Sequence, residues 1–527
     1  MKVSYPELKK NTFAQHPILS LVRHNHWFLW GIPEKKETAT DASSRYFGYW
    51  IKKNDVVYKI LHAFEFEEPI KKIEILSPYS ARLTVAQSSV DLSLDSQGLM
   101  LKTKKPVRIK ISLDMRTLYS SIEEGNVYSI APLEHGYFVN FTQENEKFSL
   151  SAYVFFEGSL KYKNEWKTIR NEFDQRRISK PYDVSIFEAF EGYVTECKIF
   201  HPDKEQLDFF HHKSAENEIG FLQERLIALM SDGMIAGLPW FPQRWFRDEL
   251  ISLWITQTDH PILSSYAART KDWYREHLED VSFINKQHGI ESIDTFPWIL
   301  QTCSLEGGTA QEICRRWVNR YVSGGKLRIP KGATWMDTLD RPHALEVNAL
   351  FFEMQKKYPA TEKEVFDIYR RKIKTHLVTE TFDAFELQTP NIFLAYLISP
   401  DLLSSVKWEV LFDRVIKSNW CAWGGFSSVS PSYEKFFGMH TGEIPDSYHQ
   451  GDSWFWMNNI AGIALSRINK KKYKKEISAI KKASLANLLN YGSLGFSSEL
   501  TSASALSSQG SPIQLWSLAT LLRLLQE

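Results

Sequence analysis

Acidic side chains and tryptophans occur together at several places in the second half of this 527-residue chain. Asp337 follows Trp335 by two residues, and Asp294 precedes Trp298 by four. Carboxylates can hold hydroxyl groups or transfer protons, and the face of an indole ring can cover an apolar surface. Together they are typical of a site that binds a sugar. Each acid taken singly could instead cap a helix, because helix N-termini favour Asp and Glu.

Helices must position these residues, because the apolar positions from residue 203 to the end recur at helical spacing. The predicted helices are 208–230, 243–255, 260–278, 292–305, 309–322, 341–358, 361–377, 390–398, 402–418, 453–469, 473–490 and 512–526. No strand pattern is predicted between them. An even number of antiparallel helices suits a closed double ring, but an irregular helical bundle would have the same helix count.

The unusual residues gather at the N-terminal ends of the even-numbered helices. Acids, amides and Trp occur in residues 239–248, 291–298, 334–348, 389–391, 446–456 and 495–499. In an alternating ring the even-numbered helices run in one direction, so these ends would meet at one mouth. The pattern therefore favours an (α/α)6 toroid with a polar and aromatic funnel.

The first half has a different periodicity. From about residue 27 to residue 202 the apolar residues alternate with polar ones, for example in 71–76, 81–92, 107–113 and 148–156. Short alternating segments separated by turn residues predict an antiparallel β-sandwich. We therefore expect a β-sandwich domain at 1–202 and a helical catalytic domain at 203–527.

Composition excludes several classes of function. The formal net charge of +1 gives no reason to expect binding to nucleic acid, and no apolar stretch is long enough to span a membrane. Four scattered cysteines fit a reducing cytoplasm. Metalloprotease, zinc-ribbon, phosphate-loop and serine-hydrolase motifs are absent, so neither a metal nor a cofactor is expected. The oligomeric state is not predicted.

Several motifs in order carry a resemblance to a known family. They are residues 237–241, 247–248, 334–337, 346–350, 448–451, 498–499 and 514–517. Over roughly 205–527 the chain resembles the C-terminal catalytic domain of glycogen debranching enzymes, the amylo-alpha-1,6-glucosidase family. That resemblance implies an (α/α)6 toroid and hydrolysis with inversion at the anomeric carbon.

By motif position, the resemblance implies that Asp337 is the general acid and Glu499 the general base. An inverting enzyme needs two carboxyl groups roughly 6.5–9.5 Å apart, with room for a water molecule. The motifs and the helix ends together give the expected substrate-binding residues, which are Trp240, Arg247, Asp248, Asp294, Trp298, Trp335, Glu346, Asn348, His449, Gln450 and Trp454.

Three positions depart from the family pattern, which usually has Arg where this chain has Thr389, Ser427 and Pro445. The loss of three positive donors is expected to alter the outer sugar subsites more than the reaction. The expected function is an inverting, exo-acting hydrolase that removes α-1,6-linked glucose from a glycogen-type or related α-glucan. The alternatives are a glucoamylase- or trehalase-like α-glucosidase on the same toroid, or a toroid that binds glucan without cleaving it.

Overall fold

The computed structural model describes residues 3–5, 18–31, 44–53, 55–95, 97–118, 120, 125–143, 147–170, 183–202, 217–256, 260–285, 289–303, 305, 307–323, 326–361, 363–378, 383, 385–442 and 445–527. The chain divides into two compact units, Met1–Ser231 with Leu488–Phe496, and Asp232–Asn487 with Ser497–Glu527. The boundary expected after residue 202 adjoins residues 203–216, which lie outside the described residues, and it stays a prediction.

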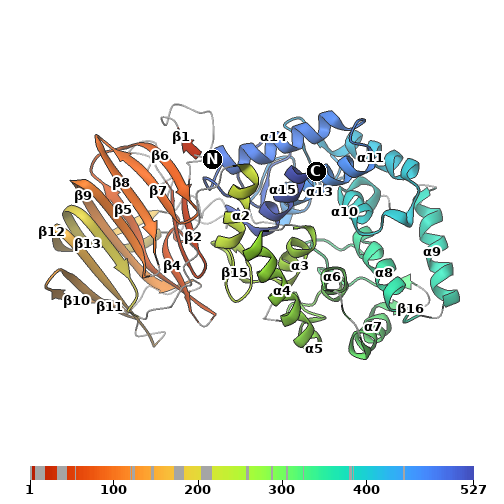
Figure 1. Cartoon of the computed structure of the whole chain (residues 1–527), viewed down its shortest axis with the longest axis horizontal. Coiled ribbons are helices and arrows are strands. Elements are labelled where there is room, and N and C mark those ends of the chain that lie inside the picture. The colour runs from red at the N-terminus through yellow and green to blue at the C-terminus, as the bar shows by residue number, and fades with distance from the viewer. Residues whose placement is uncertain are drawn as a thin grey trace. The chain divides into compact units, whose positions relative to one another are not determined.

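In the described part of the first unit, thirteen strands form one antiparallel sheet (Figure 1, red to yellow). They are β1 (Val3–Tyr5), β2 (Ile18–Arg23), β3 (His26–Gly31), β4 (Gly48–Lys53), β5 (Val56–Phe66), β6 (Ile70–Ser77), β7 (Ser80–Val85), β8 (Ser88–Leu94), β9 (Leu99–Thr117), β10 (Asn126–Leu133), β11 (Gly136–Gln143), β12 (Phe148–Arg170) and β13 (Asp183–Phe200). The antiparallel strands predicted for this half are confirmed, and their arrangement as a β-sandwich stays a prediction.

The sheet branches at the long strand β9. The first residues of β9 pair with β8 and the later ones with β5, while β13 pairs along its other edge. The alternating segment at 81–92 is two strands, β7 and β8, joined by a turn at Ala86, whose φ is 52°. A two-residue turn leaves the alternation in phase, so the period alone could not show the break.

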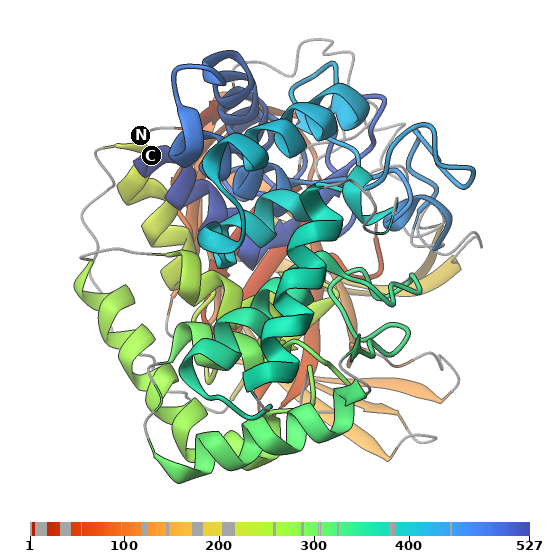
Figure 2. The same cartoon turned by 90° about the vertical axis from the view of Figure 1, so that its right-hand side faces the viewer.

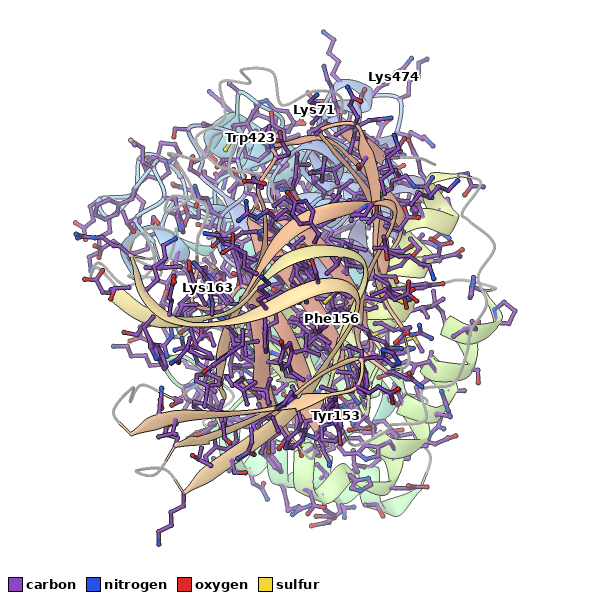
Figure 3. The ribbon with its side chains drawn as sticks, turned by 90° about the vertical axis from the view of Figure 1, so that its left-hand side faces the viewer. Lys71, Tyr153, Phe156, Lys163, Trp423 and Lys474 are labelled. Carbon is purple, nitrogen blue, oxygen red and sulfur yellow. The ribbon has the colours of Figure 1, made fainter. Side chains whose placement is uncertain are left out.

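Aromatic rings cross the neighbouring strands β11, β12 and β13. Tyr153 on β12 pairs directly with Phe138 on one side and with Phe200 on the other. Its ring lies 5.2 Å from that of Phe138 and 5.3 Å from that of Phe200 (Tyr153 is labelled in Figure 3). Cross-strand aromatic pairs of this kind stabilise a sheet.

A helix of the structure overlaps each of the twelve predicted segments (Figures 1 and 2). They are α2 (Glu218–Ala228), α3 (Phe246–Ile255), α4 (Pro261–Glu276), α6 (Thr295–Thr302), α7 (Gly308–Tyr321), α8 (Leu345–Lys357), α9 (Lys363–Val378), α10 (Asn391–Ile398), α11 (Ser405–Asn419), α13 (Phe455–Asn469), α14 (Lys474–Asn490) and α15 (Leu515–Gln526). The helical character predicted for the second half is confirmed.

Six of these helices contact one another in a closed cycle. Helix α3 contacts α6, α6 contacts α8, α8 contacts α10, α10 contacts α13, α13 contacts α15, and α15 contacts α3 again. These helices are buried on nearly every side, as in α13, where every residue from Phe455 to Leu465 is buried. By contrast, α7 buries a single stripe that includes Ala310, Ile313 and Trp317. A helix that is apolar all round belongs in an interior, and one with a stripe belongs on a surface.

The prediction that no strand interrupts the helices is wrong. Short strands β14 (Ile235–Leu238), β15 (Phe241–Arg244) and β22 (Ile513–Gln514) form one small sheet, and β20 (Ser453–Trp454) pairs with β21 (Leu500–Thr501). Strands of two to four residues are too short to show a period in the sequence. They matter for the site, because they join segments that lie just before α3, α13 and α15.

No helix among the described residues is long and apolar enough to cross a membrane. The cysteines, Cys197, Cys303, Cys314 and Cys421, are buried and form no disulfide.

Candidate active site

A cavity of about 430 Å³ opens in the helical unit, near the N-terminal ends of α3, α13 and α15. Its lining residues are Phe241, Trp245, Arg247, Asp248, Asn285, Trp335, Asp337, Tyr448, His449, Trp454, Glu499, Gln514 and Trp516. Both expected catalytic carboxylates therefore line one cavity, together with five of the expected substrate-binding residues.

Asp337 lies in the loop before α8 and has 48% of its side chain exposed within the cavity. Desolvation by the surrounding atoms raises the pKa of this carboxyl above its usual value, although Arg247 and a backbone hydrogen bond act in the opposite direction. A carboxyl group with a raised pKa keeps its proton to higher pH. Asp337 thus has the environment that a general acid needs.

Contacts on both flanks hold the loop that carries Asp337. The indole Nε1 of Trp335 donates to Asn391 Oδ1 at 2.8 Å. On the other flank, Thr338 Oγ1 lies 2.8 Å from His449 Nδ1. Residues on both sides of Asp337 are thus fixed, and its carboxyl group lines the cavity without a side-chain hydrogen bond to any residue that the structure describes.

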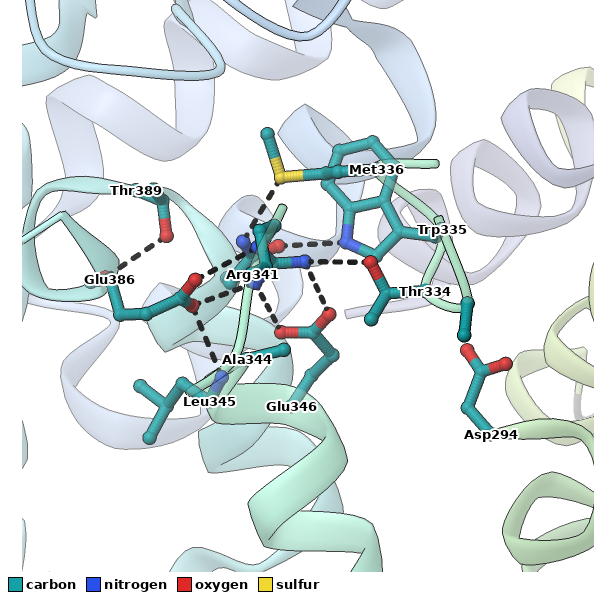
Figure 4. A network of polar contacts seen from close by, with 12 residues as sticks. Asp294, Thr334, Trp335, Met336, Arg341, Ala344, Leu345, Glu346, Glu386 and Thr389 are labelled. Carbon is teal, nitrogen blue, oxygen red and sulfur yellow. Dashed lines mark hydrogen bonds and ion pairs between the residues drawn. The ribbon is translucent and has the colours of Figure 1, made fainter. Parts of the chain in front are cut away.

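A buried charge cluster anchors the same loop further along (Figure 4). Arg341 donates to both oxygens of Glu346, at 2.7 and 2.8 Å, and to both oxygens of Glu386, at 2.8 and 2.7 Å. Each of these three side chains is only 1% exposed. Glu386 also accepts from the backbone N–H of Leu345 at 3.1 Å. The cluster therefore joins the loop, the start of α8 and the segment that precedes α10.

Glu499 is 2% exposed and has defined hydrogen-bond donors. The hydroxyl of Tyr448 donates to its Oε1 at 2.6 Å, and the backbone N–H of Ser511 donates to its Oε2 at 2.8 Å. Gly510, with φ of +62°, passes so close that a Cβ at this position would lie 2.3 Å from Oε2. The carboxylate is therefore fixed in one orientation by the segment before α15.

Arg247 lines the cavity, and its guanidinium group is held from behind. Its Nε donates to Asp294 at 3.0 and 2.9 Å, and its Nη2 donates to Asp294, Ser292 and the carbonyl of Ala333. Its Nη1 makes no hydrogen bond within the described part of the chain. Asp294 is 1% exposed and does not line the cavity, so its contact is with Arg247 rather than with open space.

Asp248 is a third carboxyl group in the cavity, and it accepts from Gln514 Nε2 at 3.3 Å. Burial raises the pKa of Asp248 to about 7. Arg247 lowers that pKa, while the negative charges of Glu499 and Asp337 raise it further. Three carboxyl groups so close to one another do not all ionise independently. Asp248 can thus hold a proton near neutral pH and donate it to a ligand oxygen in a hydrogen bond.

Aromatic rings form one wall of the cavity. Trp454 stacks on His449 at 5.0 Å with 7° between the planes, and Trp335 packs edge-on against both rings at 5.5 Å. Trp516 also lines the cavity and stacks on Trp456 at 4.6 Å. Burial, together with the positive charges of Arg341 and Arg247, lowers the pKa of His449 well below its usual value. His449 is therefore neutral at physiological pH.

Four lining residues carry a buried polar atom that has no hydrogen-bond partner among the described residues. These atoms are Asn285 Oδ1, His449 Nε2, Gln514 Oε1 and Trp516 Nε1. Unpaired polar atoms are uncommon in protein interiors, because losing hydration without a replacement costs on the order of 1–3 kcal/mol. Their grouping around one cavity is expected if a polar ligand supplies the partners.

Six of the expected binding residues do not line the cavity: Trp240, Asp294, Trp298, Glu346, Asn348 and Gln450. Trp240 is 7% exposed and Trp298, which packs on Trp254, is 1% exposed. Asn348 donates to the carbonyl of Ala344 at 2.8 Å. Contact between any of these residues and a bound sugar stays a prediction.

Six lining residues were not among the expected site residues: Phe241, Trp245, Asn285, Tyr448, Gln514 and Trp516. Most of these lie in or next to the family motifs, so the motifs could have identified them. Asn285 is the exception, because it belongs to no motif and lies in a loop before α6. Only the tertiary structure places Asn285 beside the cavity.

The family arginines absent at Thr389 and Ser427 leave small buried side chains. Thr389 Oγ1 donates to the carbonyl of Glu386 at 3.0 Å, and Ser427 Oγ donates to that of Val429 at 2.7 Å. Neither residue lines the cavity. The side chain of Pro445 lies outside the described residues.

Comparison with solved structures finds likenesses at low identity. An uncharacterized conserved protein from Thermus thermophilus is 12% identical with a TM-score of 0.36, covering 55% of this chain and 95% of its own. A GH63 mannosylglycerate hydrolase from the same organism, in complex with glucose, is 12% identical with a TM-score of 0.39, covering 58% and 99%. At such TM-scores the likeness supports no statement about function. No curated protein matches the chain in sequence.

A family model gives a more specific result. The model described as amylo-alpha-1,6-glucosidase matches residues 328–523. This range includes the loop that carries Asp337, the lining residues Tyr448 and Trp454, and Glu499. The resemblance stated from the motifs is confirmed over this range. Over residues 328–523, which are less than half of the chain, the sequence therefore resembles the amylo-alpha-1,6-glucosidase family, and the chain is a glycoside hydrolase.

Proposed function

We propose that this chain is an inverting, exo-acting glycoside hydrolase that removes α-1,6-linked glucose from glycogen-like branched glucans. The observation that carries the proposal is the pair of carboxyl groups in one cavity with contrasting environments. Asp337 is partly exposed and has a raised pKa, whereas Glu499 is buried and held by Tyr448 and the Ser511 N–H. An inverting glycosidase needs two carboxyl groups in such different states.

In this mechanism Asp337 gives its proton to the glycosidic oxygen as the bond from that oxygen to the anomeric carbon breaks. Glu499 takes a proton from a water molecule, whose oxygen forms the new bond to the anomeric carbon from the opposite face. Each turnover leaves Asp337 ionised and Glu499 protonated, and exchange with solvent restores both. The products are β-glucose and the shortened glucan.

Sugar binding is assigned to residues that line the cavity. Arg247 offers its Nη1, which has no hydrogen-bond partner among the described residues, and Asp248 offers a carboxyl group. The wall formed by Trp335, His449 and Trp454 covers the apolar face of the sugar ring. Asp294 does not contact the sugar in this proposal but holds the guanidinium group of Arg247 in place. Glu346 likewise acts indirectly, because its ion pair with Arg341 holds the loop that carries Asp337. We assign the cavity to the terminal glucose residue of the glucan.

We also infer that the helical unit is an (α/α)6 toroid. The closed cycle of contacts through α3, α6, α8, α10, α13 and α15 supports a ring of inner helices. Cavity residues at or just before the N-terminal ends of α3, α13 and α15 support a mouth at that end of the ring.

The test is to follow glucose release by NMR from limit dextrin, isomaltose-type oligosaccharides, maltose and trehalose. We expect β-glucose to form first, and from the branched or α-1,6-linked substrates in preference to maltose. Initial α-glucose would contradict inversion. Release from maltose or trehalose alone would replace the proposal with a glucoamylase- or trehalase-like activity. Binding without release from every substrate would contradict the assignment of a catalytic function.

A further inference from the structure

Two large apolar side chains stand exposed on a loop that adjoins the cavity wall. The rim loop, residues 436–442, carries Phe437 with 42% exposure and Met439 with 73% exposure. Large apolar side chains together at a surface commonly mark a binding area. Apart from His440, the rim loop has no ionisable side chain, so it presents an uncharged surface.

Backbone hydrogen bonds join the rim loop to two segments of the chain that also carry cavity residues. The N–H of Phe437 donates to the carbonyl of Gln450 at 2.9 Å, next to the lining residue His449. The N–H of Ser504 donates to the carbonyl of Gly438 at 2.9 Å, five residues beyond Glu499. The loop is thus continuous with both segments that carry cavity residues.

The rim loop is also held firmly. His440 Nδ1 lies 2.6 Å from Asp452 Oδ2, and the N–H of Thr441 donates to Ser447 Oγ at 2.9 Å. At Gly451 a Cβ would lie 1.8 Å from the carbonyl oxygen of Phe437, so only glycine permits this close approach. Because the backbone is tied at several points, Phe437 and Met439 are presented by a fixed scaffold.

We propose that Phe437 and Met439 form a platform that binds the part of the glucan chain lying outside the cavity while its terminal glucose is inside. The inference rests on the proposed function. A glucan is uncharged and exposes patches of C–H groups, which pack on an aromatic ring and on a polarisable thioether. The platform would favour long branched substrates over short ones.

The experiment compares Phe437→Ser/Met439→Ser with a control, Val406→Ser/Val410→Ser, in the full chain. Val406 and Val410 lie on α11 with 73% and 51% exposure, so the control removes similarly exposed apolar groups elsewhere. We expect kcat/KM on glycogen limit dextrin to fall about tenfold more than kcat/KM on isomaltose in the rim variant, mainly through KM. The control should match the wild type on both substrates.

Three outcomes would overturn the platform: equal losses on the two substrates, no loss on either, or a change in oligomeric state of the rim variant on size-exclusion chromatography. A change in oligomeric state would show that Phe437 and Met439 contact a second copy of the chain instead of glucan. Absence of hydrolysis by the wild type would count against the proposed function instead. In that case retardation in a glycogen-containing native gel tests the platform, and equal retardation of the rim variant and the wild type would reject it.

Discussion

Asp337 and Glu499 line the same cavity but differ in how they are held, and this difference defines the first prediction. Replacing either carboxyl group by its amide keeps the shape and removes the proton transfer. We expect Asp337→Asn and Glu499→Gln each to lower kcat by about 10²–10⁴-fold, measured as glucose release. Asp340→Asn, an exposed acid in the same loop, is the control and should retain wild-type turnover. Wild-type turnover in either cavity variant would show that its assigned role is wrong.

Gly510 provides an independent test of Glu499, because this glycine touches the carboxylate. A methyl group at Gly510 must displace Glu499 Oε2, so we expect Gly510→Ala to lower kcat by about 10²-fold with a smaller change in KM. Gly289→Ala is the matched control: its φ of +74° imposes similar backbone strain, but a Cβ there meets nothing within 4 Å. If both variants lost the same activity, backbone strain alone would explain the loss, and the contact with Glu499 would not be responsible.

At the scale of elements, the loop before α8 depends on the cluster formed by Arg341, Glu346 and Glu386. Removing the guanidinium group leaves two buried carboxylates without their partner, so we expect Arg341→Met to lower the free energy of unfolding by about 3–5 kcal/mol. We also expect kcat to fall, because the loop carries Asp337. Arg320→Met on α7 is the control. Its ion pair with Glu291 is exposed and contributes less than about 1 kcal/mol.

Denaturant unfolding and glucose release are measured on both arginine variants. If Arg341→Met proved no less stable than Arg320→Met, the cluster would not be an anchor of the loop. If stability fell but kcat of the folded variant were unchanged, the cluster would support the fold without positioning Asp337.

At the scale of the whole molecule, Asp248 makes stability depend on pH. Burial raises its pKa to about 7 in the folded chain, against about 4 when unfolded. Between these values the folded chain binds a proton that the unfolded chain has lost. The contribution of this group to stability is therefore greatest below about pH 4 and is lost as pH rises through about 7, by on the order of 4 kcal/mol.

The comparison is Asp248→Asn with the wild type in urea at several pH values from 4.5 to 7.5. Asparagine keeps the oxygen that accepts from Gln514 but does not titrate. We expect the free energy of unfolding of the variant, minus that of the wild type, to increase with pH. A constant difference would contradict the raised pKa of Asp248.

The order and approximate bounds of the helices could be read from the chain alone, because apolar spacing is a local property. For example, α13 begins at Phe455 and its predicted segment at Ser453. The family motifs are also local, and they predict Asp337 and Glu499 as the catalytic pair without any knowledge of tertiary contacts. The short strands could not be found in this way, because two residues such as Leu500 and Thr501 show no period.

Only the tertiary structure decided which side chains share the cavity and which support it from behind. Arg247 meets Asp294 across 47 residues, and Gln514 meets Asp248 across 266. The sequence predicts that both Arg247 and Asp294 bind the sugar. In the structure Asp294 is buried and accepts hydrogen bonds from Arg247. The physical reason is that the burial of a side chain and its hydrogen-bond partners depend on which distant segments of the chain pack together. Residue types and spacing determined the class of chemistry, and long-range packing assigned each residue its place in it.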